Sequence, residues 1–469
     1  MTESLLLRVL SAMIREDVVG LRSRGTVEER SDGLWLRLAA SDDSGDSDES
    51  GLAAGSAILI PVRLDGFQCE FAARQPVLRV EPDGRELRDG DGILRTLARF
   101  ADPEDHDGFV RFGGEYRDAV AGLRLQAAAR DRVVASLASQ YGDDCARWRG
   151  PSASLAFDTL AAHVGHPLYP TSAARPGLSR EDLHRYAPEF APDFALRWLA
   201  VPESAVRVQG PDIRDWLDGA WPNPSELGLA GLDASHVTLP VHPLTAAGPL
   251  LDVLRATGLE GRAVLADQHH LQVAATLSMR TVAPNKHPDT HLKLPLATST
   301  LGLLNRRSIK PGSLIDGAAT QRLLDTVLTR EPRFQDGILH ADETQYAHAG
   351  HELLAVLARR LPAGLDRCTV LPLAALPATA PDGRAVIDHL ADRWFAGDPL
   401  ALLDAVLTLL LDWQTTLLRY GIALESHQQN ISLVLDDDGH IRLLFKDDDG
   451  PRIHLARLRD ALEIGRAHV

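Results

Sequence analysis

The chain has 469 residues, of which 45% are hydrophobic, and its formal net charge is -16 at pH 7. This length and composition predict two or three domains with substantial cores and argue against an intrinsically disordered protein. The acidic balance argues against a general nucleic-acid binder, which needs a basic face to neutralise phosphates, although a local arginine cluster can still hold a small anion. The three cysteines are widely spaced and form no CxxC pair, which argues against a disulfide framework and fits the reducing cytoplasm.

The N-terminal part of the chain mixes helical and extended patterns. Residues 1–17 carry apolar side chains at helical spacing and lack the layout of a signal peptide, so they predict an amphipathic helix. Two strand-like runs, residues 34–40 and 57–64, flank an acidic loop at 41–51 and predict a hairpin. Residues 110–140 predict a helix.

The middle and C-terminal parts begin with a Pro/Gly-marked segment, residues 165–179, which predicts irregular structure and then a helix with Ser179 as its N-cap. Strands are predicted at residues 236–243, at 271–284 and from 291 onward, and helices at 313–328, 350–361 and 400–421. The last helix is long and apolar, but charged side chains interrupt it, so we expect a buried core helix and not a membrane span. The mixture predicts an α+β fold with antiparallel sheets and a helix-rich C-terminal part.

The segment ESHQQNISLVLDDDGHIRLLFKDDDG, residues 425–450, predicts a hairpin with polar groups at its open end. Two apolar runs flank an Asp-Gly turn signal, so the residues before the first strand and after the second come close in space. We therefore expect His427 and Asn430 to approach Asp447. An amide oxygen and a carboxylate are hard ligands, suited to Mg²⁺ with bound phosphates. The alternative is a charged turn in which Asn430 caps a strand end.

Two further segments carry groups suited to anions. SMRT, residues 278–281, places a guanidinium between two hydroxyls at a strand end, and arginine binds oxyanions through two parallel hydrogen bonds. The stretch that begins at His291 places Lys293, Arg306 and Arg307 among apolar residues, which suits a polycarboxylate or a phosphate. Taken singly, SMRT favours a surface arginine at an exposed strand end, and the stretch from His291 is equally compatible with a basic loop.

In combination, these segments resemble the IucA/IucC family, the NRPS-independent siderophore synthetases. The motifs GHPLYPTSAARPGLS…YAPEF, LPVHP, SMRT, HLKLPL and ESHQQN…KDDDG follow one another in the family's order over about residues 150 to 450. The resemblance implies a cupped-hand architecture, with a thumb-like domain at 1–145, fingers at 146–315 and a palm at 316–469. It also implies that a carboxylate, usually citrate, is adenylated with Mg-ATP and passed to an amine, a hydroxylamine or an alcohol.

The matching motifs imply roles for residues of the fingers. Lys293 and an arginine of the 306–307 pair, assigned to Arg306, would hold the carboxylate substrate and the phosphate charge. His166 would lie nearby in the fingers loop. The contacts to the ATP phosphates would come from Ser278, Arg280 and Thr281.

The palm would supply the remaining nucleotide contacts, from Glu425, His427, Asn430 and Asp447. Of these, Asn430 and Asp447 would lie near Mg²⁺. The groups assigned to catalysis are Arg280, Lys293, Arg306 and His427.

The sequence departs from the family pattern at several positions. Tyr169 replaces the second histidine of the usual GHPxHP, and Ala173 replaces the lysine that commonly follows. Lys446 replaces the arginine of the usual RD, which keeps the charge but loses the planar fork. Residues 242–245 read HPLT where the family has HPWQ. These changes put the contacts of the fingers loop in doubt and leave room for an altered substrate or a weakened activity.

The chain end is a further departure, because the family usually continues well past the hairpin. We expect the final segment EIGRAHV, residues 463–469, to be foreign to the protein and the palm to be shortened, with a natural short form as the alternative. The resemblance is compatible with a homodimer and gives no reason to expect a membrane or nucleic-acid partner.

Two other functions remain open on the sequence. A kinase-like phosphotransferase also places an Asn and an Asp around a hairpin to hold Mg²⁺. However, the chain has no N-terminal Gly-rich loop followed by a strand lysine and no HxD before Asn430. The third possibility is a degenerate homologue that binds a carboxylate or a nucleotide without catalysis, which Tyr169 and Ala173 would support.

Overall fold

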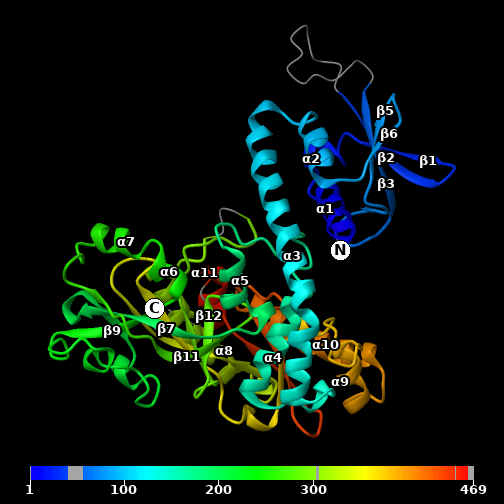
Figure 1. Ribbon diagram of the computed structural model, residues 1–469. Coiled ribbons are helices and arrows are strands. Elements are labelled where there is room, and N and C mark those ends of the chain that lie inside the picture. Colours follow the sequence, from blue (N-terminus) through cyan, green and yellow to red (C-terminus); the bar gives the residue numbers. More distant parts are fainter. Residues whose placement is uncertain (1, 41–55, 303–305, 449, 463–469) are drawn as a thin grey trace. The chain divides into compact units, whose positions relative to one another are not determined.

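The computed structural model describes residues 2–40, 56–302, 306–448 and 450–462, and these form two compact units (Figure 1). The first unit comprises Met1–Ala128, Gly165–Gly177 and Ser299–Asn305; the second comprises Ala129–Val164, Leu178–Thr298 and Arg306–Val469. The acidic loop predicted at 41–51 and the chain end at 463–469 lie outside the described residues. The division into thumb, fingers and palm stays a prediction.

The first unit packs helices against an antiparallel sheet. Helix α1 (Thr2–Arg15) buries Leu5, Leu6, Val9, Leu10 and Met13, which confirms the amphipathic helix. The predicted hairpin is also confirmed, since β2 pairs with β3. The order is β1-β2-β3-β5-β6 with β4 on β3, and the strands are β1 (Thr26–Arg30), β2 (Gly33–Ala39), β3 (Ala57–Leu64), β4 (Phe71–Ala73), β5 (Leu78–Glu81) and β6 (Arg85–Leu87). Helix α2 (Gly90–Ala98) and the long α3 (His106–Tyr141) follow, which confirms the helix predicted at 110–140.

The second unit contains a nine-stranded antiparallel sheet, in the order β10-β7-β11-β12-β13-β16-β15-β8 with β9 on β7. Its strands are β7 (Asp193–Pro202), β8 (Arg207–Gln209), β9 (His236–Val241), β10 (Val264–Leu265), β11 (His270–Ala275), β12 (Thr281–Pro284), β13 (Thr290–Lys293), β15 (Asp342–His348) and β16 (Ala355–Arg360). The helices up to this point are α4 (Gly150–Ala162), α5 (Arg180–Tyr186), α6 (Pro243–Ala247), α7 (Leu250–Ala256) and α8 (Pro311–Arg330). Ser179 caps α5 in a capping box, as its sequence predicted.

A second, four-stranded sheet has the order β14-β20-β19-β17. Its strands are β14 (Ile338–His340), β17 (Thr369–Pro372), β19 (Ile431–Leu435) and β20 (Ile441–Phe445). The predicted hairpin is confirmed by the antiparallel pairing of β19 with β20, whereas β14 runs parallel to β20. The remaining elements are α9 (Val386–Trp394), α10 (Pro399–Arg419), the short pair β18 (Ile422–Ala423) and β21 (Arg452–Ile453), and α11 (Leu455–Leu462).

The predicted helix at 350–361 is wrong, because residues 355–360 form strand β16 in the middle of the large sheet. The segment consists largely of residues that favour helices, such as leucine, alanine and arginine. It pairs on both edges, with β13 and with β15, so the tertiary hydrogen bonds of the sheet override its local preference. The C-terminal part is therefore less helical than predicted.

Helix α10 is buried on one face only, which corrects the prediction of a buried core helix. Leu402, Val406, Trp413 and Leu417 belong to the core of the second unit, and Trp413 packs edge-on against Phe334 at 5.0 Å. The opposite face exposes Leu400, Leu407, Leu411 and Leu418, which fall on one stripe at 100° per residue. By length and composition α10 could cross a membrane, but one such helix among the described residues is weak evidence, since helices of soluble cores also meet this criterion.

The two faces of α10 predict different costs for the same substitution at neighbouring positions. Leu417 is fully buried, whereas Leu418 is 50% exposed. Leu417→Ala should lower the free energy of unfolding by about 2–5 kcal/mol, because it removes buried methyl groups and leaves a cavity. Leu418→Ala should change it by less than about 1 kcal/mol. Urea unfolding of both variants measures the difference, and equal costs would contradict the one-sided burial of α10.

Candidate functional site

The SMRT segment forms a tight turn between β11 and β12 of the large sheet. Thr276 Oγ1 donates to the carbonyl of Thr281 at 2.9 Å, and the N–H of Arg280 donates to the carbonyl of Ser278 at 2.7 Å. Met279 takes a left-handed backbone conformation with φ of 62°, which is uncommon for a residue other than glycine. The Arg280 guanidinium donates to the Ser308 carbonyl at 3.0 Å. The turn is thus held in one shape by its own backbone and by a neighbouring segment.

A buried aspartate of helix α4 supports this turn. Burial raises the pKa of Asp158, while the charge of Lys446 and a hydrogen bond with the Leu277 backbone act in the opposite direction. Burial likewise lowers the pKa of Lys446, and Asp158 opposes that shift. Asp158 thus lies near the Leu277 backbone, next to the SMRT turn, and within reach of the charge of Lys446.

Two adjacent strands, β13 and β16, present buried basic side chains from one face of the sheet. Lys293 lies opposite Thr281 and Leu357 in the β12–β13–β16 ladder, and Arg359 lies opposite His291. Because side chains alternate along a strand, Lys293, His291 and Arg359 share one face. The Lys293 and Arg359 side chains are each 2% exposed. Two cations buried to this degree need counter-charges close by.

Asp447 supplies the first of these counter-charges from the end of the hairpin. Its Oδ1 lies 2.7 Å from Lys293 Nζ and 2.5 Å from Arg359 Nη2. Burial alone would raise the pKa of Asp447, but the charges of Arg359 and Lys293 hold it well below its usual range. The backbone of Asp447 is left-handed, with φ of 62°.

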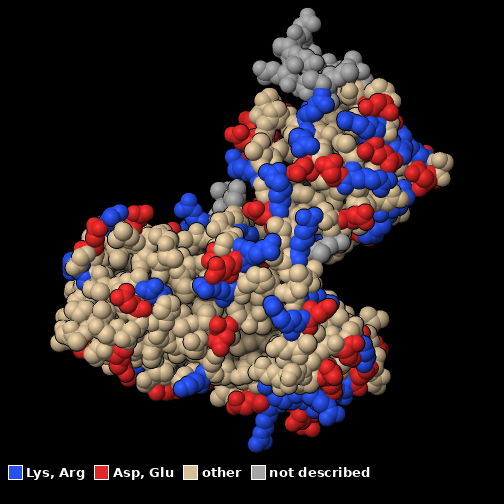
Figure 2. All heavy atoms as spheres, in the orientation of Figure 1, with Lys and Arg blue, Asp and Glu red and all other residues tan. Residues whose placement is uncertain are grey.

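Glu343 of β15 completes a cluster of four charges. Its Oε1 lies 2.5 Å from Arg359 Nε and accepts the backbone N–H of Asp447 at 2.9 Å. Burial raises the pKa of Glu343, and the charge of Arg359 opposes that shift. The two carboxylates balance Lys293 and Arg359, so the cluster is formally neutral before any ligand binds. Figure 2 shows acidic and basic side chains interspersed on the face in view, whereas these two cations are buried.

The hairpin places Asn430 beside Asp447, as predicted. The N–H of Lys446 donates to the Asn430 carbonyl at 3.1 Å, so the two strand ends are joined next to Asp447. Asn430 is 6% exposed and its side-chain amide donates to the Glu425 carbonyl at 3.4 Å. Glu425 and His427 are exposed residues of the preceding turn. Their approach to the nucleotide, and that of His427 to Asp447, stay predictions.

Asp448, the next carboxylate of the KDDDG run, has a different partner. Asp448 is buried and its Oδ2 lies 3.2 Å from His340 Nδ1, on β14. The His340 ring stacks on Phe445 with 5.5 Å between centroids. Asp448 therefore links the end of the hairpin to β14, the parallel neighbour of β20. Asp449 lies outside the described residues.

The fingers-loop residues and the arginine pair lie apart from this cluster in the sequence. His166 belongs to the first unit, where its Nδ1 accepts the N–H groups of Leu168 and Tyr169 and its carbonyl accepts Arg8. Burial, and then Glu115, raise the pKa of Tyr169 to about 12. In the second unit, Arg307 bonds to the backbone of Thr298, and Arg306 is exposed. The roles of His166 and Arg306 stay predictions.

The sequence analysis missed Glu343, Arg359 and Asp158. Arg359 was missed because its segment was predicted to be a helix, where its side chain would not share a face with Lys293. The run AVLARRL carries no alternation of apolar and charged residues, because Arg359 and Arg360 are consecutive, so no period-2 signal marked it as a strand. Glu343 and Asp158 carry no local signal, since each is defined by partners that are distant in the sequence.

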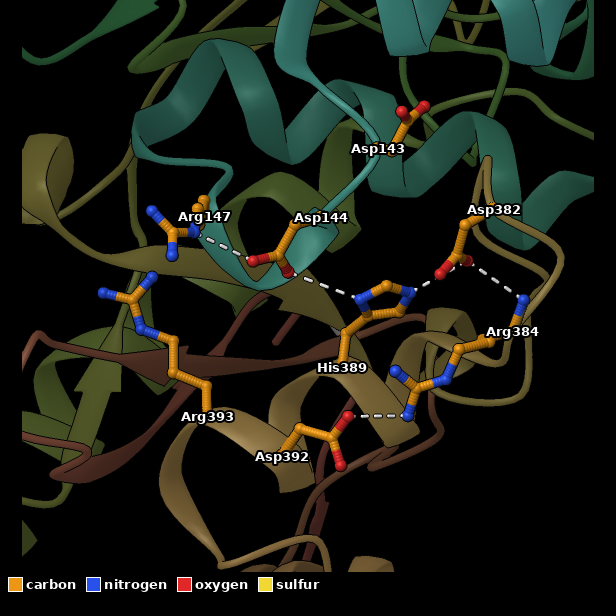
Figure 3. Close-up of a pocket in the computed structure, with 8 residues that line it drawn as sticks. All are labelled: Asp143, Asp144, Arg147, Asp382, Arg384, His389, Asp392 and Arg393. Carbon is orange, nitrogen blue, oxygen red and sulfur yellow. Dashed lines mark hydrogen bonds and ion pairs between the residues drawn. The ribbon is translucent and has the colours of Figure 1, made fainter.

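A different concave region of the second unit is lined by charged residues but is held together by its own ion pairs (Figure 3). His389 lies between two carboxylates, with Nδ1 3.3 Å from Asp144 and Nε2 3.0 Å from Asp382. Arg384 pairs with Asp392 at 2.7 Å. These ion pairs join α9 to the segments before it, so the charged residues of this region already pair with one another. The buried cluster around Asp447 is therefore the candidate site.

Comparisons with known proteins agree with the sequence motifs. Residues 154–378 match the model of the IucA / IucC family, and residues 400–468 match that of the ferric iron reductase FhuF-like transporter. An uncharacterized protein, y4xN of Sinorhizobium fredii, is 31% identical over 332 residues, which are 64% of this chain and 51% of that protein. Aerobactin synthase of Escherichia coli is 28% identical over 316 residues, or 61% of this chain and 54% of the synthase. The chain thus spans about half the length of these curated relatives.

The fold agrees as well. The structure of ATP-bound aerobactin synthetase IucA from Klebsiella pneumoniae aligns with a TM-score of 0.72 and 19% identity, covering 99% of this chain and 82% of that one. Its mixture of helices and antiparallel sheets is that of the present molecule. The family model and the relatives coincide over the segment that carries SMRT, Lys293 and Arg359, so residues 154–378 are those of the IucA/IucC family.

Proposed function

We propose that this protein is an ATP-dependent synthetase of siderophore biosynthesis that adenylates a carboxylate and condenses it with an amine, a hydroxylamine or an alcohol. Citrate is the expected acid, and the cytoplasm is the expected compartment. The observation that carries the proposal is the buried pair of cations, Lys293 and Arg359, gathered around Asp447 next to the SMRT turn. Family membership and the similarity to aerobactin synthase support it.

The reaction would proceed in two balanced steps. A carboxylate oxygen attacks the α-phosphorus of ATP, forming the acyl–phosphate bond and releasing pyrophosphate. The amine then attacks the acyl carbon, the bond to the adenylate oxygen breaks, and AMP leaves while the amine loses its proton. Arg280 and Lys293 would offset the phosphate charge in the first step, because fixed cations in a water-poor site stabilise developing charge without reorganising. The Ser278 and Thr281 hydroxyls would orient the phosphates.

Asn430 and Asp447 are the residues proposed to hold a magnesium ion. Their amide and carboxylate oxygens are hard ligands of the kind Mg²⁺ prefers. Among the described residues, no group of three histidine, cysteine, aspartate or glutamate side chains is arranged to hold a metal by itself. Asn430 and Asp447 would hold the ion, which when bound would neutralise phosphate charge. His427, Glu425 and, in the first unit, His166 would add nucleotide contacts, and Arg306 would contact the acid.

The nucleotide product distinguishes this function from the alternatives. With ATP, Mg²⁺, citrate and hydroxylamine, we expect acid-dependent AMP and pyrophosphate in equal amounts. A phosphotransferase would release ADP, because a hydroxyl would attack the γ-phosphorus. Chromatography of the nucleotides over a panel of citrate, succinate and 2-oxoglutarate gives the answer. Acid-dependent ADP would overturn the adenylation mechanism, and absence of any product would favour a degenerate homologue.

Arg280→Lys should weaken ATP binding at least tenfold, about 1.4 kcal/mol, although it keeps the charge. The lysine cannot contact a phosphate through two parallel bonds while also bonding to the Ser308 carbonyl. Isothermal titration with ATP measures the change. The matched control is Arg255→Lys, because Arg255 is an exposed arginine of α7. This variant should bind ATP like the wild type. An unaltered ATP affinity in Arg280→Lys would favour a purely structural arginine.

Asp447→Asn should abolish turnover and also destabilise the fold. Its loss leaves Lys293 and Arg359 with too little counter-charge in a buried setting, a cost of about 3–5 kcal/mol. We expect turnover per folded molecule to fall below detection at temperatures where circular dichroism shows native structure. Asp438→Asn, the same change in the exposed turn of the same hairpin, should leave both quantities close to wild type. Normal turnover in folded Asp447→Asn would contradict the role of this carboxylate.

A further inference from the structure

We propose that Glu343 and Arg359 form a positioning pair that fixes the Asp447 carboxylate for the reaction. The inference rests on the proposed function, because it takes Asp447 to be the group that must be held. Neither residue would touch the substrate. The pair would act by setting where the Asp447 side chain points and by holding its backbone in an uncommon conformation.

The first support is the geometry of the contacts. Arg359 binds Asp447 Oδ1 through Nη2 and Glu343 Oε1 through Nε, each at 2.5 Å, so two neighbouring nitrogens of one planar guanidinium are engaged by different carboxylates. A planar group held at two of its nitrogens has a fixed orientation. The Asp447 carboxylate is thereby directed by a side chain that cannot rotate without breaking its bond to Glu343.

The second support is the bond from Glu343 to the backbone of Asp447. Glu343 Oε1 accepts the Asp447 N–H at 2.9 Å, while Asp447 has φ of 62°. A non-glycine residue in this region costs of order 1 kcal/mol or more and persists only where its surroundings hold it. Glu343 thus acts on Asp447 in two ways. It accepts the backbone N–H of Asp447, and it holds Arg359, which binds the Asp447 carboxylate.

The third support is burial. The side chains of Glu343 and Arg359 are 3% and 2% exposed, against 18% for Asp447. The pair therefore lies behind the accessible carboxylate, on the side of strands β15 and β16. Partners that lie behind a functional group and orient it typically contribute 10–100-fold to activity or ligand affinity.

Arg359→Lys separates positioning from charge. The lysine keeps the positive charge but can form only one of the two directed contacts at a time. We expect kcat per folded molecule to fall 10–100-fold while KM for ATP and for the acid stays within about threefold. Arg360→Lys is the matched control, because Arg360 is the next residue, faces the other way along β16 and bonds to the Trp216 carbonyl. It should keep at least half of the wild-type kcat.

Glu343→Gln tests the other half of the pair with a variant of the same shape. The amide oxygen can still accept the Asp447 N–H, but the countercharge of Arg359 is lost. We expect a similar loss in kcat with little change in KM. A wild-type kcat per folded molecule in both Arg359→Lys and Glu343→Gln would overturn the proposal, as would losses of activity that a smaller folded fraction explains completely.

A double-mutant cycle in stability tests the pair without any reaction. Urea unfolding of wild type, Glu343→Gln, Asp447→Asn and the double variant should show that the double variant costs less than the sum of the single variants. If the free-energy costs of the single variants add up to that of the double variant while the wild type is active, the positioning pair is refuted and the proposed function is not. An inactive wild type with clear coupling would instead refute the proposed function while leaving the contact between Glu343 and Asp447 established.

Discussion

The structure of the candidate site depends on one shared carboxylate. Asp447 Oδ1 lies within 2.7 Å of both Lys293 and Arg359, which come from neighbouring strands of the large sheet, while Asp447 itself comes from the smaller sheet. Each cation is 2% exposed, so the loss of this shared partner would destabilise the burial of both. The pairing therefore constrains the register of β13 and β16 and the position of the hairpin together. A slip of one residue in either strand would turn a buried cation to the opposite face.

This constraint has a consequence for function. The cations lose their water when the protein folds, and their loss of hydration is compensated by carboxylates already in place. An anionic ligand therefore meets charges that are oriented in advance, as in sites where electrostatic preorganisation lowers a barrier. Formal neutrality of the four-charge cluster keeps it compatible with the fold in the absence of ligand. The SMRT turn adds the positive charge of Arg280 beside the cluster, and this charge contributes to the lowered pKa of Asp447.

Local features of the sequence predicted local parts of this arrangement. The β19–β20 hairpin and the approach of Asn430 to Asp447 follow from an Asp-Gly turn between apolar runs, which involves residues close in the chain. Strand β16 was mistaken for a helix because its pairing with β13 and β15 decides its conformation, and those partners are distant in sequence. Arg359 was missed for this reason, whereas Glu343 was missed because its partners are distant in the sequence. The face of α10 that remains exposed was equally unpredictable, since its composition is apolar on both sides.

The replacement of the family's arginine by Lys446 takes on a different meaning in this geometry. On the sequence alone, losing the planar fork next to Asp447 weakens the recognition of an oxyanion. In the structure, the fork that engages Asp447 is that of Arg359, on β16 of the large sheet, and the carboxylate that acts most strongly on Lys446 is Asp158. A lysine is a compact point charge and suffices to balance one buried carboxylate. The substitution is therefore compatible with an intact arrangement around Asp447, because directional contact and charge balance are supplied by different residues.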